Sequence, residues 1–321
     1  MGMADTVTKE YIRSNEVFAD AFNYLIYDGE QVVKPALLQE LDTTEIAIPF
    51  ALGENENQTE DVVQKYRDVL KSAVIMQDSR ASYILLGVEN QTEIHYAMPV
   101  RNIIYDALQY GKQVSEVAKR HKSKGDRKGH NKGEYLSGFY KEDRIRPVIT
   151  LVVHFGADEW DGPLSLYEMM DLEDKKLLEF VQDYRIFLID PYKLANNDLE
   201  KFSTSLGDVL GYIKYSNDKK ALSKFLNDNQ VMIMDNDAAR VIRDVTNTPI
   251  YVPDGKGEID MCKAVRDMID ESKQEGMAAG ELNKAKKMAL KMYKKGDSIE
   301  EIAEMAEVSV DQVKEWINSA V

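Results

Sequence analysis

The sequence predicts an α/β fold followed by a helical C-terminal part. Apolar runs at residues 83–88 and 147–155 have the length and composition of buried strands, and the second is rich in β-branched residues. Residues 184–190 form a further expected strand, preceded by a helix that starts near Ser165 and ends at Met170. Strand, helix and strand in this order indicate a sheet with a crossover helix. From about residue 195 the apolar spacing is helical.

The N-terminal part predicts one helix and one ambiguous segment. Apolar side chains at positions 17, 18, 21, 22, 25 and 26 predict a helix over residues 16–27. Ser14 or Asn15 can cap this helix, and Asp28-Gly29 ends it. Residues 61–76 fit either a helix followed by a strand or a pair of strands with Asp68 at the bend.

The apolar run 83–88 ends in Glu89-Asn90-Gln91, which we interpret as a candidate site. Side chains alternate along a strand, so Glu89 and Gln91 share one face and Asn90 points to the other. With Asp68 on a neighbouring strand and facing the same way, two carboxylates and one amide oxygen converge. Oxygen ligands of this kind suit Mg²⁺ or Mn²⁺.

A helix is expected to follow from Met98-Pro99 to about Ala118, with proline in its first turn. Its apolar stripe is predicted to pack on the sheet and comprises Val100, Ile103, Ile104, Ala107 and Leu108. Along the edge of that stripe, facing the site, lie Arg101, Tyr105 and Gln109. Arg101 can also pair with Glu89 or Asp106, and Tyr105 can be a core residue.

The charge distribution is uneven. A formal charge of −15 argues against a protein that coats nucleic acid non-specifically. Residues 119–132, however, contain seven Lys or Arg and one acid, together with Gly and no apolar residue, which predicts a mobile basic loop. A solvated loop without a partner is the alternative. If the loop contacts DNA, the candidates are Lys119, Arg120, Lys122, Lys124, Arg127 and Lys128.

Length and composition predict a folded protein of one large or two ordinary domains. The single cysteine, Cys262, excludes an internal disulfide and a cysteine-based metal cluster. We find no run of 18 apolar residues and no secretory signal pattern, so we expect no membrane span and a cytoplasmic location.

The C-terminal part is expected to be a long helix from near Asp260, followed by short helices at 299–306 and 310–317. Two short helices with a turn at 307–309 resemble a helix-turn-helix. Between Asp297 and Glu315 there are seven acids and one Lys, which disfavours DNA reading by this unit. We therefore expect a packing or oligomerisation module that can drive a homo-oligomer.

Four segments resemble the recombination-promoting nuclease / YhgA-like putative transposase family of the PD-(D/E)xK nuclease superfamily. They are Glu16–Leu25, Arg67–Lys71, Leu86–Gln91 and Met98–Arg101 with Tyr105-Asp106. The resemblance spans roughly residues 10 to 190. It implies a restriction-endonuclease-like mixed sheet flanked by helices at 1–195, a helical extension at 196–258 and a helical tail at 259–321.

The resemblance also implies Mg²⁺-dependent (or Mn²⁺-dependent) hydrolysis of phosphodiester bonds in DNA. Asp68 and Glu89 match the metal-binding acids of the family, and Glu16 matches a helix acid of the superfamily. Gln91 falls where the superfamily has Lys. An amide can position a water molecule, but it cannot supply a positive charge.

On this interpretation the metal is held by Asp68, Glu89 and a main-chain oxygen near Asn90, and Gln91 positions the attacking water. Arg101 or the basic loop neutralises phosphate charge, and Tyr105 hydrogen-bonds in the site or to DNA. The alternative is a catalytically silent module that binds nucleic acid or protein, with a C-terminal helix that drives assembly.

Overall fold

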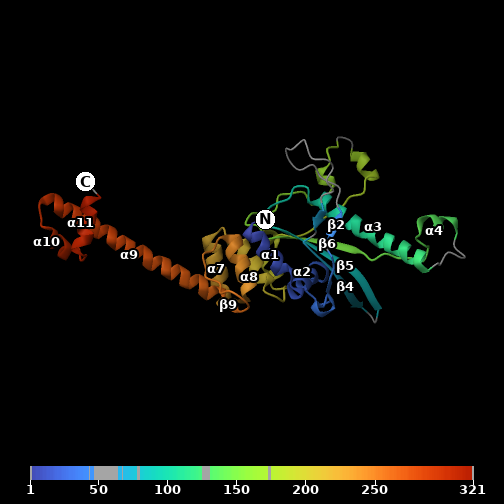
Figure 1. Cartoon of the computed structure of the whole chain (residues 1–321), viewed down its shortest axis with the longest axis horizontal. Helices are drawn as coiled ribbons and strands as arrows, with labels where there is room; N and C mark the ends of the chain where they lie inside the picture. The colour runs from blue at the N-terminus through green and yellow to red at the C-terminus, as the bar shows by residue number, and fades with distance from the viewer. Residues whose placement is uncertain are drawn as a thin grey trace. The chain divides into compact units, whose positions relative to one another are not determined.

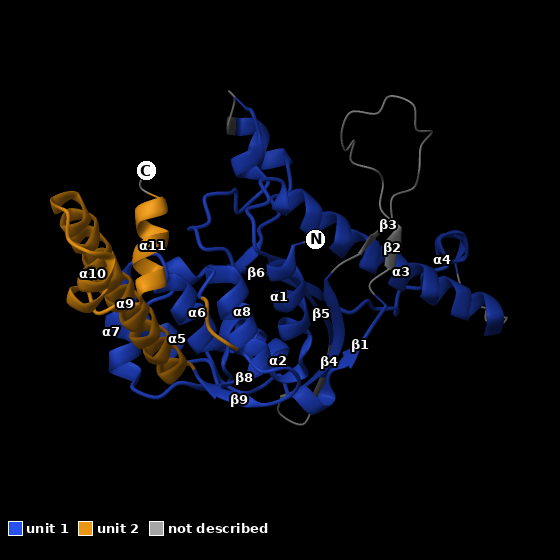
Figure 2. Cartoon of the chain, turned by 60° about the vertical axis from the view of Figure 1, so that its left-hand side comes forward, with its two compact units in different colours: residues 1–248, 252–260 blue, residues 249–251, 261–321 orange. Residues whose placement is uncertain are grey.

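A computed structural model describes residues 2–42, 44–46, 64–66, 68–77, 80–124, 131–172 and 175–319. The chain divides into two compact units (Figure 2). The first comprises residues 1–248 and 252–260, and the second comprises residues 249–251 and 261–321. The three-part division at residues 195 and 258 stays a prediction.

A five-stranded mixed sheet forms the centre of the first unit (Figure 1). Its strands, in spatial order, are β1 (Gln39–Glu40), β4 (Val69–Gln77), β5 (Arg80–Gln91), β6 (Val148–His154) and β7 (Phe187–Ile189). The pairs β1/β4 and β4/β5 are antiparallel, whereas β5/β6 and β6/β7 are parallel. Strand β6 is buried on both faces except at Ile149, as its β-branched composition predicts. The predicted α/β fold with a mixed sheet is confirmed.

Helices cover both faces of this sheet. On β5, Asn90 Nδ2 donates to Thr8 Oγ1 of α1 (Met3–Arg13), whereas the neighbouring Glu89 pairs with Arg101 of α3 (Met98–Lys124). Because successive side chains of a strand point to opposite faces, α1 and α3 lie on opposite sides of the sheet (Figure 1). Helix α2 (Asn15–Tyr27) follows α1 directly and starts where predicted, with Ser14 as its cap.

The buried face of α3 differs from the predicted one. Val100, Ile103, Ile104 and Leu108 are only partly buried and Ala107 is exposed, whereas Asn102, Tyr105, Asp106 and Gln109 are buried. Burial of Asp106 is possible because Thr150 Oγ1 and Tyr184 OH each donate to its carboxylate at 2.6 Å. The predicted apolar stripe was therefore wrong, since hydrogen-bond partners from distant strands allow a polar face to pack inward.

The basic segment is also different from its prediction. Helix α3 continues to Lys124, and α4 (Lys132–Ser137) begins at the end of the same segment, so a loop starting at Lys119 was wrong. Lys and Arg are good helix formers, and cations in the last turn interact favourably with the helix dipole. Arg127 and Lys128 lie outside the described residues.

The crossover between β6 and β7 was predicted to contain a helix from Ser165 to Met170. Within its described residues the structure has only 3₁₀ segments, at Tyr167–Met169 and Lys175–Phe180. A segment this short gains few of the hydrogen bonds that offset helix nucleation.

Four helices and a two-stranded sheet complete the first unit, and they confirm the helical pattern after residue 195. The helices are α5 (Asn196–Leu199), α6 (Leu206–Tyr215), α7 (Lys219–Asn229) and α8 (Asn236–Thr246). The strands are β8 (Ile233–Asp235) and β9 (Glu258–Asp260), and a second small sheet pairs β2 (Thr44–Ile46) with β3 (Gln64–Tyr66). Buried Asp20 ties α2 to this region by accepting hydrogen bonds from Ser203 and Thr204.

The second unit contains the predicted long helix and two-helix tail. Its helices are α9 (Met261–Lys295), α10 (Ile299–Met305) and α11 (Val310–Asn318), and Ser298 and Ser309 cap the two short ones. A small core joins them and consists of Ala289, Ile302, Ala303, Ala306, Val313, Trp316 and Ile317. Assembly through this unit stays a prediction. No helix in the described part of the chain is long and apolar enough to cross a membrane.

Candidate functional site

The register of the β4–β5 hairpin places Asp68 and Glu89 at adjoining positions just beyond the last pair of the ladder. The ladder ends with Val69 opposite Val88, so the next residues on the two strands are Asp68 and Glu89. Asp68 occupies a bend between β3 and β4, as one of the two predictions for residues 61–76 required. Its Oδ2 accepts a hydrogen bond from the backbone N–H of Asn90 at 2.9 Å, which holds the carboxylate at the end of β5.

Glu89 is fully buried and faces α3. Its Oε2 lies 2.9 Å from Nη2 of Arg101, whose side chain is 25% exposed. A buried carboxylate is costly unless a cation compensates it, so this ion pair accounts for the burial of Glu89. Two ion-pair partners were predicted for Arg101, namely Glu89 and Asp106. The structure shows the ion pair with Glu89, and Asp106 instead accepts hydrogen bonds from Thr150 and Tyr184.

Tyr105 lies one turn after Arg101 on α3 and is buried. The Arg101 guanidinium is 5.7 Å from the centroid of the Tyr105 ring. Burial and the negative charge of Glu89 raise the pKa of Tyr105, so its hydroxyl stays protonated at neutral pH. Burial lowers the pKa of Arg101, but Glu89, Tyr105 and Asp68 outweigh it and raise that pKa. Arg101 is therefore a permanent cation beside both carboxylates.

Lys9 is a site residue that the sequence analysis missed. It lies on α1, and its Nζ is 2.9 Å from Oδ1 of Asp68. Its side chain is 26% exposed, and that of Asp68 is 13% exposed. The sequence does contain a signal for α1, because the buried residues Thr8, Tyr11 and Ile12 have helical spacing.

Gln91 and Glu16, the two other predicted site residues, lie in different parts of the structure. Gln91 follows Glu89 on the same face of β5, and its Nε2 donates to the carbonyl oxygen of Asn90 at 2.8 Å. Glu16 lies in the first turn of α2, where Ser14 Oγ donates to it at 3.0 Å. Its charge acts on Lys71, whose ammonium donates to Arg13 O and Asn15 Oδ1 on the α1 side of the sheet. Glu16 therefore lies on the α1 side of the sheet, whereas Glu89 faces α3.

Carboxylate oxygens such as those of Asp68 and Glu89 are the donor type that suits a hard divalent cation, and the two residues adjoin at the end of the β4–β5 ladder. No group of three or more His, Cys, Asp or Glu in the described ranges is arranged to hold a metal, so this site offers two carboxylates. Mg²⁺ is commonly bound by one or two carboxylates together with water and substrate phosphate. The charges of Asp68 and Glu89 are balanced by Lys9 and Arg101, so a bound dication would leave a net positive site suited to a phosphodiester.

The predicted DNA-contact residues Lys119, Arg120, Lys122 and Lys124 are exposed on the last turns of α3. In the same stretch, His121 stacks on Tyr140 at 3.8 Å between ring centroids, and its Nε2 lies 2.8 Å from Oδ2 of Asp143. Asp143 also accepts the Tyr140 N–H at 2.7 Å. These contacts hold the segment before β6 against the basic end of α3.

This contact predicts a pH dependence. Burial raises the pKa of Asp143, but the hydrogen bonds from Tyr140 and His121 and the charge of Arg120 outweigh it and lower that pKa below its usual value. A lowered folded-state pKa contributes stability above the ordinary value of about 3.9, and this contribution is lost as pH falls through the folded-state value. We expect the Tyr140 amide to stay protected from hydrogen exchange at pH 5 and to lose protection only after the pH has fallen below the ordinary value of about 3.9. In Asp143→Asn the protection should already be low at pH 5; unchanged protection there would contradict the role of Asp143.

Comparisons with known proteins address the family of the chain. Neither the curated proteins nor the solved structures gave a match. The sequence model of one family, described as "Putative transposase, YhgA-like", matches residues 49–238. This match covers more than half of the chain and includes Asp68, Glu89, Gln91, Arg101 and Tyr105. The chain therefore belongs to the YhgA-like putative transposase family.

Proposed function

We propose that this protein is a metal-dependent DNA endonuclease of the PD-(D/E)xK type, which hydrolyses phosphodiester bonds with Mg²⁺ or Mn²⁺. The main support is the position of the two carboxylates at the end of the β4–β5 ladder. Asp68 directly precedes Val69 and Glu89 directly follows Val88, and Val69 and Val88 are the last pair of that ladder. The transposase description of the family supports DNA as the substrate. Asp68, Glu89 and the carbonyl oxygen of Asn90 would hold the ion.

When bound, such an ion polarises the scissile phosphate and lowers the pKa of an attacking water. The protein orients the two carboxylates that would bind the ion. The Asn90 N–H fixes Oδ2 of Asp68, and Arg101 fixes Oε2 of Glu89. Because each carboxylate oxygen has two lone pairs, both groups keep acceptor sites for a cation while making these contacts.

Four further side chains have roles in binding the phosphate and water. Arg101 supplies a permanent positive charge next to the reacting phosphate, and Tyr105 positions the guanidinium from the following turn. Gln91 lies on the same face as Glu89 and can orient a water molecule, but it is uncharged. Lys9 supplies, from α1, the ammonium group that Gln91 cannot supply.

The role of Lys9 gives a testable prediction. We expect Lys9→Met to lower kcat about 10- to 100-fold, as is typical for a group that supports a metal-ligating carboxylate. Lys9→Arg should restore a large part of the rate, because it keeps the charge. Initial rates of plasmid nicking measure the effect, and exposed Lys34→Met is the matched control. If Lys9→Met cleaves like wild type, Lys9 only packs against Asp68.

The function itself is tested by incubating supercoiled plasmid with purified protein and Mg²⁺, Mn²⁺ or EDTA. We expect nicking with either ion and none with EDTA. If the wild-type protein binds no metal and cuts neither duplex nor single-stranded DNA, the nuclease proposal fails. The chain would then be a catalytically silent interaction module. The two ion pairs favour that second function. Lys9 already balances the charge of Asp68, and Arg101 balances that of Glu89, without a metal ion.

A further inference from the structure

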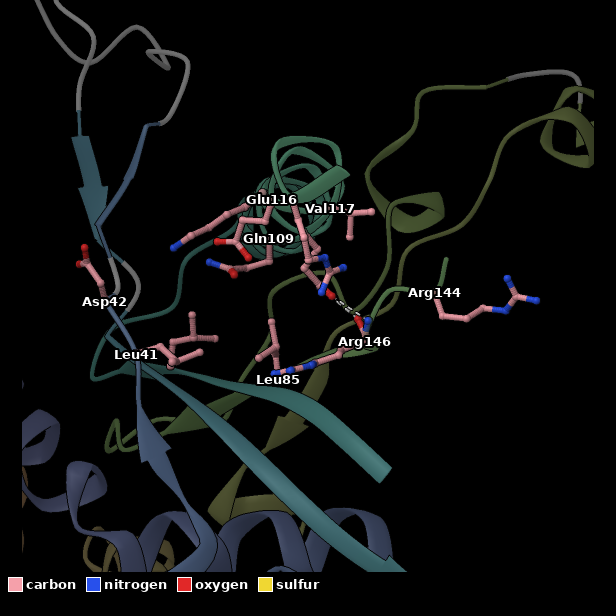
Figure 3. A pocket seen from close by; sticks show the side chains of 12 residues that line it. Leu41, Asp42, Leu85, Gln109, Glu116, Val117, Arg144 and Arg146 are labelled. Atoms are coloured by element: carbon pink, nitrogen blue, oxygen red, sulfur yellow. Dashed lines mark hydrogen bonds between the residues drawn. The ribbon is translucent and has the colours of Figure 1, made fainter. Parts of the chain in front are cut away.

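A cavity of about 520 Å³ lies between α3 and the sheet (Figure 3). Its apolar floor contains Leu41, Leu70 and Leu85, which belong to or pack against one hydrophobic cluster. Helix α3 forms the opposite wall, with Gln109, Glu116 and Val117 in view, and Arg144 extends outward at the rim (Figure 3).

The cavity is basic, although the chain is strongly acidic. Four of its lining residues are cationic, against two acids, Asp42 and Glu116. The cationic ones are Lys112, Arg120, Arg144 and Arg146. A second cavity, of about 740 Å³, lies beyond the end of β5, and its described lining contains four acids and no Lys or Arg. Phosphate groups would therefore be attracted to the first cavity and repelled from the second.

The backbone of Arg146 is fixed by hydrogen bonds to α3. Arg146 N donates to Gln113 Oε1 at 2.7 Å, and Gln113 Nε2 donates to Arg146 O at 3.1 Å. Tyr110 OH accepts the Val148 N–H at 3.1 Å, which adds a second link between α3 and the start of β6. These bonds hold the backbone of Arg146 beside α3, so less ordering entropy is lost when a ligand binds.

The cavity shares a face of the sheet with the candidate active site. Leu85 lies four residues before Glu89 on β5, so both side chains point toward α3. At about 3.3 Å per residue, the cavity floor lies about 13 Å from Glu89 along the strand. The phosphates of one DNA strand follow a helical path, so a strand bound at Glu89 can reach the cavity within a few nucleotides.

We propose that this cavity binds the phosphodiester backbone of the DNA strand that is cleaved at Asp68 and Glu89, about 13 Å from the bond that is cleaved. Arginine binds phosphate oxygens through paired N–H groups, and Arg120 and Arg146 supply two such groups. The guanidinium of Arg144 donates to the carbonyl oxygens of Lys141 and Asp143 and extends outward (Figure 3), so it adds positive charge at the rim. The leucine floor offers an apolar surface to the sugar. The proposal rests on the endonuclease function, because it defines how the substrate reaches the carboxylates.

The test measures DNA binding without cleavage. In a Glu89→Gln background, a fluorescein-labelled duplex is titrated with full-length protein with and without the added pair Arg120→Gln/Arg146→Gln. We expect the pair to raise Kd at least 10-fold. The slope of log K against log salt concentration should fall in magnitude by about 2, as expected for two lost phosphate contacts. The matched control is Lys219→Gln/Lys220→Gln on α7, which removes the same charge from exposed positions and should leave Kd unchanged.

Each outcome decides between the two proposals. If the variant with Arg120→Gln/Arg146→Gln binds DNA as tightly as the Glu89→Gln protein, while the wild-type protein cleaves plasmid, the cavity proposal is overturned and the nuclease function stands. If the wild-type protein does not cleave plasmid but the Arg120→Gln/Arg146→Gln variant loses DNA binding, the cavity remains a DNA site and the nuclease function fails. Competition by pyrophosphate at concentrations near the protein's Kd for DNA would assign the cavity to free phosphate compounds instead. Should the pair unfold, the exposed pair Lys112→Gln/Arg144→Gln provides the same test.

Discussion

Glu89→Gln and Asp68→Asn are each expected to lower metal-dependent nicking of plasmid DNA by at least about 100-fold, the scale seen when one group that stabilises the transition state is removed. Both substitutions keep the size of the side chain and remove the negative charge that would bind the cation. Rates of nicking with Mg²⁺ measure the effect, and Mn²⁺ binding followed by titration calorimetry shows whether the ion is lost.

A matched control separates the site from general charge effects. Glu93 is exposed and lies just beyond the end of β5, so Glu93→Gln should nick at the wild-type rate. If Glu89→Gln and Asp68→Asn both keep that rate while remaining folded, the reacting phosphate does not bind at these carboxylates. A nuclease with its site elsewhere in the chain would then be indicated.

Arg101→Met is expected to destabilise the first unit by about 3–5 kcal/mol. The substitution leaves the fully buried carboxylate of Glu89 without its guanidinium partner at 2.9 Å. Adding Glu89→Gln should recover most of this loss, because the remaining amide is neutral. A single substitution that costs less than 1 kcal/mol, with no recovery in the double variant, would show that the ion pair is energetically unimportant.

The chain offers a direct way to measure this effect in one unit. Of its two tryptophans, Trp160 is buried in the first unit and Trp316 lies in the small core of the second. In a Trp316→Phe background, the fluorescence of Trp160 reports denaturant unfolding of the first unit alone. The two variants and the double variant are compared at one pH, and their midpoints give the coupling between Arg101 and Glu89.

Local pattern was sufficient for β5, β6 and β7 and for the start of α3. The β-branched run of β6 and the proline at position 99 specify their elements through neighbours in the sequence. Glu89 was predicted at the end of its strand, and Asp68 at a bend as one of two options for residues 61–76, and both positions are found; that the two carboxylates hold one ion stays a prediction. These are properties of a few consecutive residues, which is why the sequence is informative about them.

Long-range contacts were not accessible in the same way. Asp106 is buried because Thr150 and Tyr184, 44 and 78 residues away, donate hydrogen bonds to it. Lys9 reaches Asp68 only because α1 packs on the sheet, and Arg146 meets Gln113 across 33 residues. In the basic stretch, charge content suggested a loop, whereas the helix propensity of Lys and Arg determined the structure to Lys124.

The nine-pair ladder of β4 and β5 has a consequence for the folding of this chain. A hairpin that forms one residue out of register would turn Glu89 toward α1 and present Asn90 to Arg101. Such a misfolded molecule would have an unaltered sequence and nearly the same number of backbone hydrogen bonds, yet its acidic pair would be separated. A preparation of full-length protein can therefore contain such a fraction, and the share of molecules in which Arg101 pairs with Glu89 measures the fidelity of one hairpin.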